Sequence, residues 1–251
     1  MTGRRPLPTV DGMTPSRTVL AARLAMAGAV TSLVLVPLHG LARFNTDFGH
    51  KDLEECCAAW WGRPGLEALH PLITWSDPYT VYLWYGRVWV LLLAAATFCA
   101  FAVHAVLRPV NRTQTWAWRA VLAGLVLETV GIGGAFLTPW LDQFYLGVGV
   151  PGVALGLIGG TVLGISSLRR GPLPRFTAVV LAIGILNEIV LSAFLYAGGA
   201  VVPMLFAWAV AGRAAARAVT APARAPMFAD SSDLGTGNRQ TSESGQARRA
   251  S

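Results

Sequence analysis

The stretch YLWYGRVWVLLLAAATFCAFAVHAVL, residues 82–107, decides the fold class. Apart from Arg87 and His104 it contains only apolar, aromatic and small residues. About 20 helical residues are enough to cross a hydrocarbon core about 30 Å thick. The stretch therefore predicts a transmembrane helix.

Five more apolar stretches repeat this pattern, at residues 24–41, 120–139, 146–168, 176–196 and 200–212. The last is the weakest, because its apolar run is short before Arg213, although Arg213 and Arg217 can snorkel and lengthen it. The chain is 54% hydrophobic and 13% charged, whereas soluble domains carry about 25% charged residues. We predict an all-α, polytopic transmembrane helix bundle of six spans.

Arginines occupy alternate connections, which gives the bundle an orientation by the positive-inside rule. One set of segments contains Arg4, Arg5, Arg17, Arg23, Arg108, Arg112, Arg119, Arg169, Arg170, Arg175, Arg213, Arg217 and Arg224. The other set contains only Arg43, Lys51 and Arg63, together with seven acidic residues. We predict a multi-pass protein of the cell membrane with both termini in the cytoplasm. The formal charge of +7 is spread along this face, so the expected partner is the lipid bilayer and not nucleic acid.

The chain divides by composition into a disordered N-terminus at 1–16, a transmembrane domain at 17–218 and a disordered tail at 219–251. The outer loop at 42–80 is expected to contain one short helix on the membrane surface, with Gly62 and Pro64 ending it. Its apolar face would consist of Leu53, Cys56, Cys57, Trp60 and Trp61. Such a helix is either a lid that seals the bundle or a gate over a cavity.

Cysteine and histidine give little indication of chemistry. Cys56 and Cys57 are adjacent, and free thiols, an intermolecular bridge and a vicinal disulfide all stay open for them. His39 and His104 lie at opposite faces of the membrane and do not match as haem ligands. We predict no metal site and no cofactor.

Charges within the bilayer are the sharpest functional signal. Glu128 and Glu188 lie about 13 to 18 Å from the cytoplasmic interface, and Arg87 enters from the outside to a comparable depth. An ionised side chain at that depth costs at least about 2.5 to 3.5 kcal/mol on insertion scales. We therefore expect all three side chains to face the interior as one interacting group. The group is either an ionic clamp that fixes helix register or a site that handles protons or binds a ligand.

Neighbouring polar and aromatic residues extend this predicted site. Asn187 precedes Glu188 on the same helix, and aromatic residues crowd the first turns of the second span, where they cannot all face lipid. The predicted ligand-binding set is Arg87, Glu128, Asn187, Glu188, Trp84, Tyr85 and Trp89.

Four glycines recur at four-residue intervals in the fourth span, at Gly152, Gly156, Gly160 and Gly164. This spacing predicts a groove that allows another helix to approach backbone to backbone. The partner is either a helix of the same chain or a second protomer or membrane subunit. A bulky side chain at Gly156 is expected to be more harmful than one at Gly159, which lies off that face.

Two classes of function fit these residues. The first is a small non-enzymatic carrier or accessory membrane subunit that uses the buried acids for coupling or packing. The second is an intramembrane enzyme for a lipophilic substrate, such as an isomerase or terpenoid cyclase, with Glu128 or Glu188 as catalytic general acid. We favour the first. The excess of arginine over lysine, with abundant alanine and glycine, is typical of a bacterium with a GC-rich genome.

Overall fold

A computed structural model describes residues 14–55, 59–138, 141–195, 199 and 201–221. These residues are helical apart from short connections, and those up to Thr220 form one compact unit. The first helix of this unit begins at Pro15, and its last helix ends at Thr220. Most of the segments predicted to be disordered, 1–16 and 219–251, lie outside the described residues.

Three long helices begin at capping residues that the sequence supplies. Helix α1, Pro15–Phe44, begins after Thr14, helix α5, Pro78–Val106, after Asp77, and helix α6, Arg112–Leu137, after Asn111. The side chains of Thr14, Asp77 and Asn111 accept hydrogen bonds from backbone amides three residues further on, at 3.4, 2.9 and 2.9 Å. Such caps satisfy amides that have no partner within the helix, which fixes where each helix begins.

Five helices of the described chain are long and apolar enough to cross a membrane, which shows a multi-span membrane protein. They are α1, α5, α6, the combined helix Tyr145–Arg170, which starts with a π-helical turn and continues as α8, Val150–Arg170, and α11, Val201–Thr220. The short helix α7, Leu141–Phe144, precedes the π-helical turn.

The predicted fifth span is broken rather than straight. It consists of α9, Arg175–Ala182, and α10, Gly184–Leu195, which are bent by 67° relative to each other. The count is therefore five spans, or six when this bent pair crosses the membrane. The predicted sixth span, weak by hydropathy, is the continuous helix α11.

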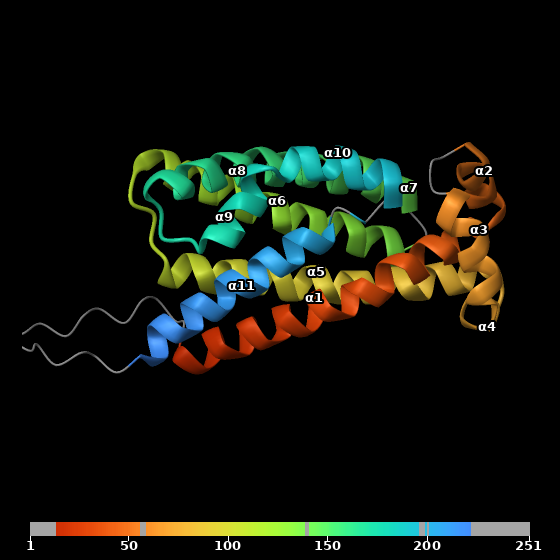
Figure 1. Cartoon of the computed structure of the whole chain (residues 1–251), viewed down its shortest axis with the longest axis horizontal. Coiled ribbons are helices and arrows are strands. Elements are labelled where there is room, and N and C mark those ends of the chain that lie inside the picture. Colours follow the sequence, from red (N-terminus) through yellow and green to blue (C-terminus); the bar gives the residue numbers. More distant parts are fainter. Residues whose placement is uncertain (1–13, 56–58, 139–140, 196–198, 200, 222–251) are drawn as a thin grey trace, which may run out of the picture. The chain divides into compact units, whose positions relative to one another are not determined.

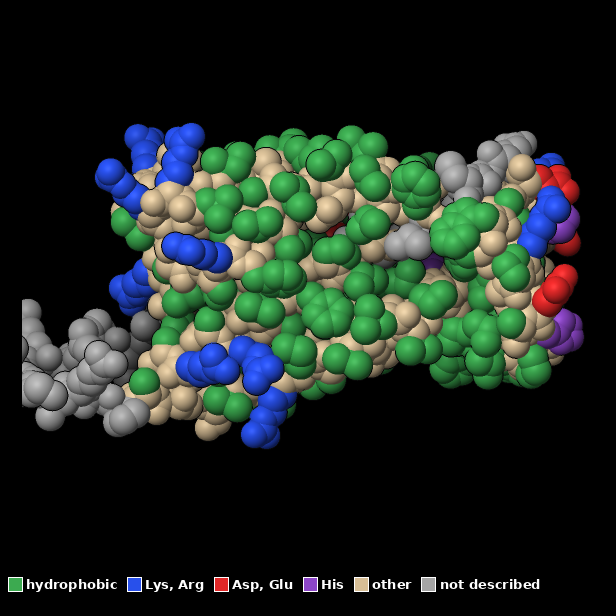
Figure 2. All heavy atoms as spheres, viewed as in Figure 1, with side chains coloured by type: hydrophobic (Ala, Val, Ile, Leu, Met, Phe, Trp, Pro, Cys, Tyr) green, Lys and Arg blue, Asp and Glu red, His purple; other side chains and the backbone are tan. Residues whose placement is uncertain are grey.

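Three short helices gather at one end of the bundle (Figure 1). They are α2, Asp47–Glu55, α3, Ala59–Ala68, and α4, His70–Ile73. We call them the outer cap, after the outside location that the sequence predicts for residues 42–80. The cap packs Leu53 and Ile73 against Leu41, Phe44 and further buried side chains of α1, α5 and α6. Figure 2 shows acidic and histidine side chains at this end and most Lys and Arg side chains at the opposite end.

The single interfacial helix predicted for the outer loop is therefore replaced by three. Gly62 and Pro64 do not end a helix, because both lie inside α3. A Cβ on Gly62 would lie 2.5 Å from Leu53 and 3.2 Å from Phe44, so glycine is needed there for close packing and not for termination. Cys56 and Cys57, expected on the apolar face of that helix, lie outside the described residues.

The glycines of α8 contact two neighbours of the same chain. A Cβ on Gly152 would meet the backbone of α6 at Glu128, whereas a Cβ on Gly164 would meet the backbone of α9 at Ala182. A four-residue step turns a helix by about 40° beyond a full circle, so the run from Gly152 to Gly164 rotates by about 120°. The expected single groove is thus divided between two helices. The glycine face of α8 was also a predicted contact for a second protomer. Helix α6 covers this face at Gly152, and α9 covers it at Gly164.

The relative importance of Gly156 and Gly159 is reversed from our expectation. A Cβ on Gly159 would lie 2.7 Å from the Ala120 Cβ and 2.9 Å from the Val121 amide nitrogen. The nearest atom to a Cβ on Gly156 is the Gly124 Cα, at an ordinary 3.8 Å. Gly152 and Gly159 are seven residues apart, a spacing that drifts only about 20° and so stays against α6.

Candidate functional site

A cavity of about 600 Å³ lies inside the bundle. Its walls come from α1, α5, α6, α8, α9, α10, α11 and the π-helical turn. Most of the lining is apolar, with aromatic rings from Tyr82, Trp89, Phe136, Tyr145 and Trp208. The volume is within the range of small-molecule sites, about 300 to 1,000 Å³.

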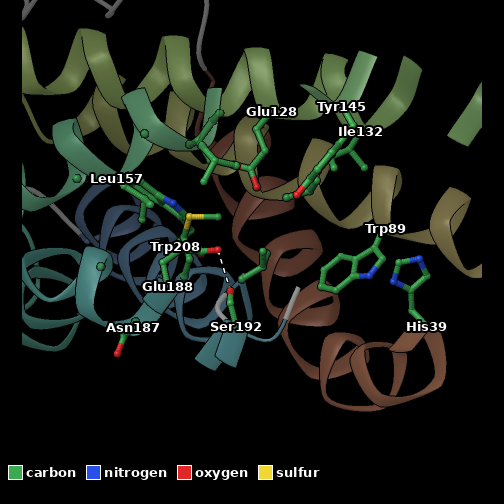
Figure 3. Close-up of a pocket in the computed structure, with 18 of the residues that line it drawn as sticks. His39, Trp89, Glu128, Ile132, Tyr145, Leu157, Asn187, Glu188, Ser192 and Trp208 are labelled. Carbon is green, nitrogen blue, oxygen red and sulfur yellow. Dashed lines mark hydrogen bonds between the residues drawn. The ribbon is translucent and has the colours of Figure 1, made fainter. Parts of the chain in front are cut away.

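Glu128 and Glu188 both line this cavity, as the sequence predicted for their inward orientation. Glu128 is only 6% exposed, and within the described residues no hydrogen-bond or ion-pair partner meets its carboxyl group. Glu188 is half-buried on α10 and accepts a hydrogen bond from the Ser192 hydroxyl at 2.9 Å. The two side chains project from different helices, α6 and α10, into the same cavity (Figure 3).

Arg87 is not part of this group. Its side chain is exposed, its guanidinium lies 5.4 Å from the centre of the Trp84 ring, and its Nε donates to the Phe136 carbonyl at 3.4 Å. Two residues along a helix correspond to about 200° of rotation, so Arg87 and the cavity-lining Trp89 point in opposite directions. The expected grouping of Arg87 with Glu128 and Glu188 therefore does not occur in this structure.

The other predicted ligand residues divide in the same way. Trp89 and Asn187 line the cavity, although Figure 3 shows the Asn187 amide pointing away from Glu188. Trp84 is 50% exposed and Tyr85 donates its hydroxyl to the Leu72 carbonyl at 2.8 Å, and neither lines the cavity. Side chains that share the first turns of α5 thus face different surroundings.

Arg43 is the arginine in the described cavity lining, and no sequence pattern indicates it as a site residue. Its Nη2 lies 2.8 Å from Asp52 Oδ2, and its Nε donates to the same oxygen at 3.0 Å. Its Nη1 also donates to the Tyr82 hydroxyl at 3.4 Å. The pairing gives this guanidinium a carboxylate partner on α2, and within the described residues no ion pair joins it to either glutamate.

His39 and Tyr145 are the other polar residues that sequence reasoning did not place here. The His39 ring stacks on Tyr82 with centroids 5.0 Å apart, and its Nε2 is buried without a hydrogen-bond partner within the described residues. Tyr145 lines the same cavity as both glutamates (Figure 3). The sequence indicates only the depth of His39 in the membrane, near the end of α1, and not that its ring faces a cavity.

Trp208 Nε1 is a second buried polar atom at the cavity wall that has no partner in the described part of the chain. Buried polar groups normally have a hydrogen-bond partner, so unpartnered ones beside a cavity indicate room for a ligand or water. Within the described residues no group of three His, Cys, Asp or Glu side chains could hold a metal ion.

No family model matches this chain, and neither the curated proteins nor the solved structures contain a significant match.

Proposed function

We propose that this membrane protein is a small carrier whose cavity binds hydrophobic organic cations in exchange for protons. The observation that carries the proposal is the pair of carboxyl groups, Glu128 and Glu188, that line an aromatic cavity and have no ion-pair partner within the described residues. The one arginine in the lining, Arg43, is already paired with Asp52.

The charge balance of the cavity supports a competition between protons and a cation. Two carboxylates that face one low-dielectric space cannot both ionise cheaply. Either a proton or a bound cation relieves this cost, so each displaces the other. Aromatic faces attract an organic cation in addition, because the ring quadrupole is negative above the plane.

Helix α10 is suited to change position during such an exchange. It carries Glu188 beyond the 67° bend, and its apolar side chains Ile185, Leu186, Ile189, Val190 and Phe194 are exposed. Broken helices near the midplane are a recurring way in which carriers position coupling groups. The Trp61 indole of the outer cap donates to the Phe194 carbonyl at 3.1 Å, which connects the cap to the end of α10.

Transport of tetraphenylphosphonium by the purified chain in liposomes, with an imposed proton gradient, tests this function. We expect saturable, gradient-dependent exchange that falls at least about tenfold in Glu128→Gln and in Glu188→Gln, since each substitution removes a charge that the cation compensates. Glu67→Gln is the matched control, because Glu67 is exposed on the outer cap. Equal exchange in all three variants would contradict the proposal.

Binding measured separately in detergent distinguishes the carrier from an accessory subunit. A carrier binds and exchanges the cation, whereas an accessory subunit with the same cavity binds it without gradient-dependent exchange.

An intramembrane enzyme is the second candidate, and the presence of Tyr145 in the same cavity lining as Glu128 favours it. A protonated Glu128 could donate to a double bond, with aromatic rings stabilising the resulting carbocation. Turnover of a polyisoprenoid by the purified chain, abolished in Glu128→Gln, would replace the carrier as the assigned function.

A further inference from the structure

A second hollow lies between the start of α1 and the end of α11, with a volume of about 340 Å³. We call it the arginine groove. Four residues from each helix form it: Val19, Ala22, Arg23, Met26, Arg213, Ala216, Arg217 and Thr220. It is separate from the central cavity, and it does not depend on the carrier proposal.

Three exposed guanidinium groups converge on this groove from two helices. Within the described residues Arg23, Arg213 and Arg217 have no carboxylate partner. Neither α1 nor α11 contains an acidic residue, and the connections at 107–111 and 171–174 contain none either. Three like charges that share one hollow without a carboxylate partner in the described residues therefore favour the binding of an anion there.

The groove also has an apolar side. Val19, Ala22, Met26 and Ala216 form part of its lining, while Leu20 and Leu24 on α1 are 51% and 44% exposed nearby. A soluble anion would use only the guanidinium groups. A phospholipid would use both features, with its phosphate on the arginines and its acyl chains along the exposed leucines.

We propose that the arginine groove is a binding site for the phosphate of an anionic glycerophospholipid. The position fits this ligand, because the groove lies where two transmembrane helices end in the arginine-rich region of the bundle (Figure 2). Bidentate hydrogen bonds from arginine to phosphate oxygens would supply the recognition. Basic pockets between transmembrane helices on the cytoplasmic side are a recurrent setting for anionic headgroups.

The test compares lipid binding to the purified full chain and two double variants by native mass spectrometry and by thermal shift. Arg213→Gln with Arg217→Gln removes two groove charges. Arg169→Gln with Arg170→Gln removes the same charge from exposed positions at the end of α8, outside the groove. The probes are dioleoylphosphatidylglycerol, dioleoylphosphatidylcholine and inorganic phosphate at equal concentrations.

We expect the native chain to bind phosphatidylglycerol at least about tenfold more tightly than phosphatidylcholine, since only the first has a net negative headgroup. The groove variant should lose this preference, and the α8 variant should keep it. Equal losses in the two variants would show face-wide attraction rather than a site and would overturn the proposal. Inorganic phosphate that stabilises the chain as well as the lipid does would overturn the lipid as ligand, because acyl chains would then contribute nothing.

Discussion

Arg43 connects the outer cap to the central cavity through three kinds of contact. It pairs with Asp52, donates to Tyr82, and lies 5.0 Å from the centre of the Phe48 ring. The side chains of Arg43 and Asp52 are 27% and 31% exposed. Their pairing is therefore intermediate between a solvated surface ion pair and a fully buried one.

A double-mutant cycle measures this pair. We expect Arg43→Met with Asp52→Asn to be less harmful than the sum of the two single changes, with a coupling energy of about 1 kcal/mol. Thermal or denaturant unfolding in detergent provides the free energies. The pair His50 and Glu54, 3.6 Å apart and more than 60% exposed, is the control and should show almost no coupling. Comparable coupling at both pairs would mean that Arg43 does not fix the cap.

Asp77 should make the outer end sensitive to acid. Hydrogen bonds from the Thr80 side chain and backbone hold the pKa of this exposed carboxyl below its usual range. A lowered native pKa means that the stabilisation is complete above the ordinary pKa of aspartate and is lost as the pH falls through the native value. Asp77→Asn keeps a capping oxygen but does not titrate.

The melting temperature of the native chain should therefore fall more between pH 6 and pH 3 than that of Asp77→Asn. Parallel curves for the two proteins would show that the cap does not contribute to acid sensitivity.

The sequence placed Glu128 and Glu188 correctly but not the arginine near them. The cost of burying an isolated charge makes inward orientation of a midplane glutamate readable from depth alone. The first apolar stretch ends at residue 41, so Arg43 reads as a loop charge in the sequence. In the structure α1 continues to Phe44. Its partner Asp52 belongs to another helix, and no local pattern reveals such a contact.

At the scale of elements, α6 and α8 approach backbone to backbone. A Cβ on Gly124 would meet the backbone of Gly156, and a Cβ on Gly131 would meet that of Gly149. The glycine spacing in α8 predicted close packing, but helix rotation decides which glycine touches which neighbour. Which glycine touches which neighbour depends on the crossing angle of the two helices. That angle depends on the side chains of both helices, so the sequence of α8 alone does not predict it.

Substitutions at Gly156 and Gly159 test this interface. We expect Gly159→Ala to destabilise the chain by about 1 to 3 kcal/mol, because the new methyl group overlaps Ala120 and Val121 across the interface. Gly156→Ala should be neutral or slightly stabilising, since its Cβ has ordinary contacts and alanine favours a helix. Unfolding in dodecylmaltoside with increasing sodium dodecyl sulfate gives both values, and the reverse order would contradict the packing.

The broken span shows a limit of hydropathy as a predictor. Residues 176–196 are mostly apolar, and their hydropathy does not predict the 67° bend after Ala182. The break adjoins Gly184, a residue that weakens a helix, and it precedes Asn187 and Glu188 at the cavity. Composition places a segment in the bilayer, whereas the path within it depends on tertiary contacts.

At the scale of the whole unit, contacts at its two ends indicate how often the chain crosses. The arginine groove brings the start of α1 beside the end of α11. At the other end, Phe194 of α10 meets Trp61 of the outer cap, and Arg43 at the end of α1 meets Asp52 of the same cap. We infer that the bent pair α9 and α10 carries the chain from the arginine-rich end to the cap, which makes six crossings.

Reporter fusions distinguish six crossings from five. Alkaline phosphatase at residue 60 should be active, because the outer cap is expected outside, while a fluorescent protein at residue 230 should fold in the cytoplasm. If α9 and α10 instead formed a re-entrant loop, five crossings would place residue 230 outside, where alkaline phosphatase fused there would be active. Arg213 and Arg217 oppose that arrangement, because export of arginines that flank a span is disfavoured. A variant of the residue-230 fusion in which both arginines are replaced by glutamine tests this effect. If these charges hold the end of α11 in the cytoplasm, its cytoplasmic signal should be weaker.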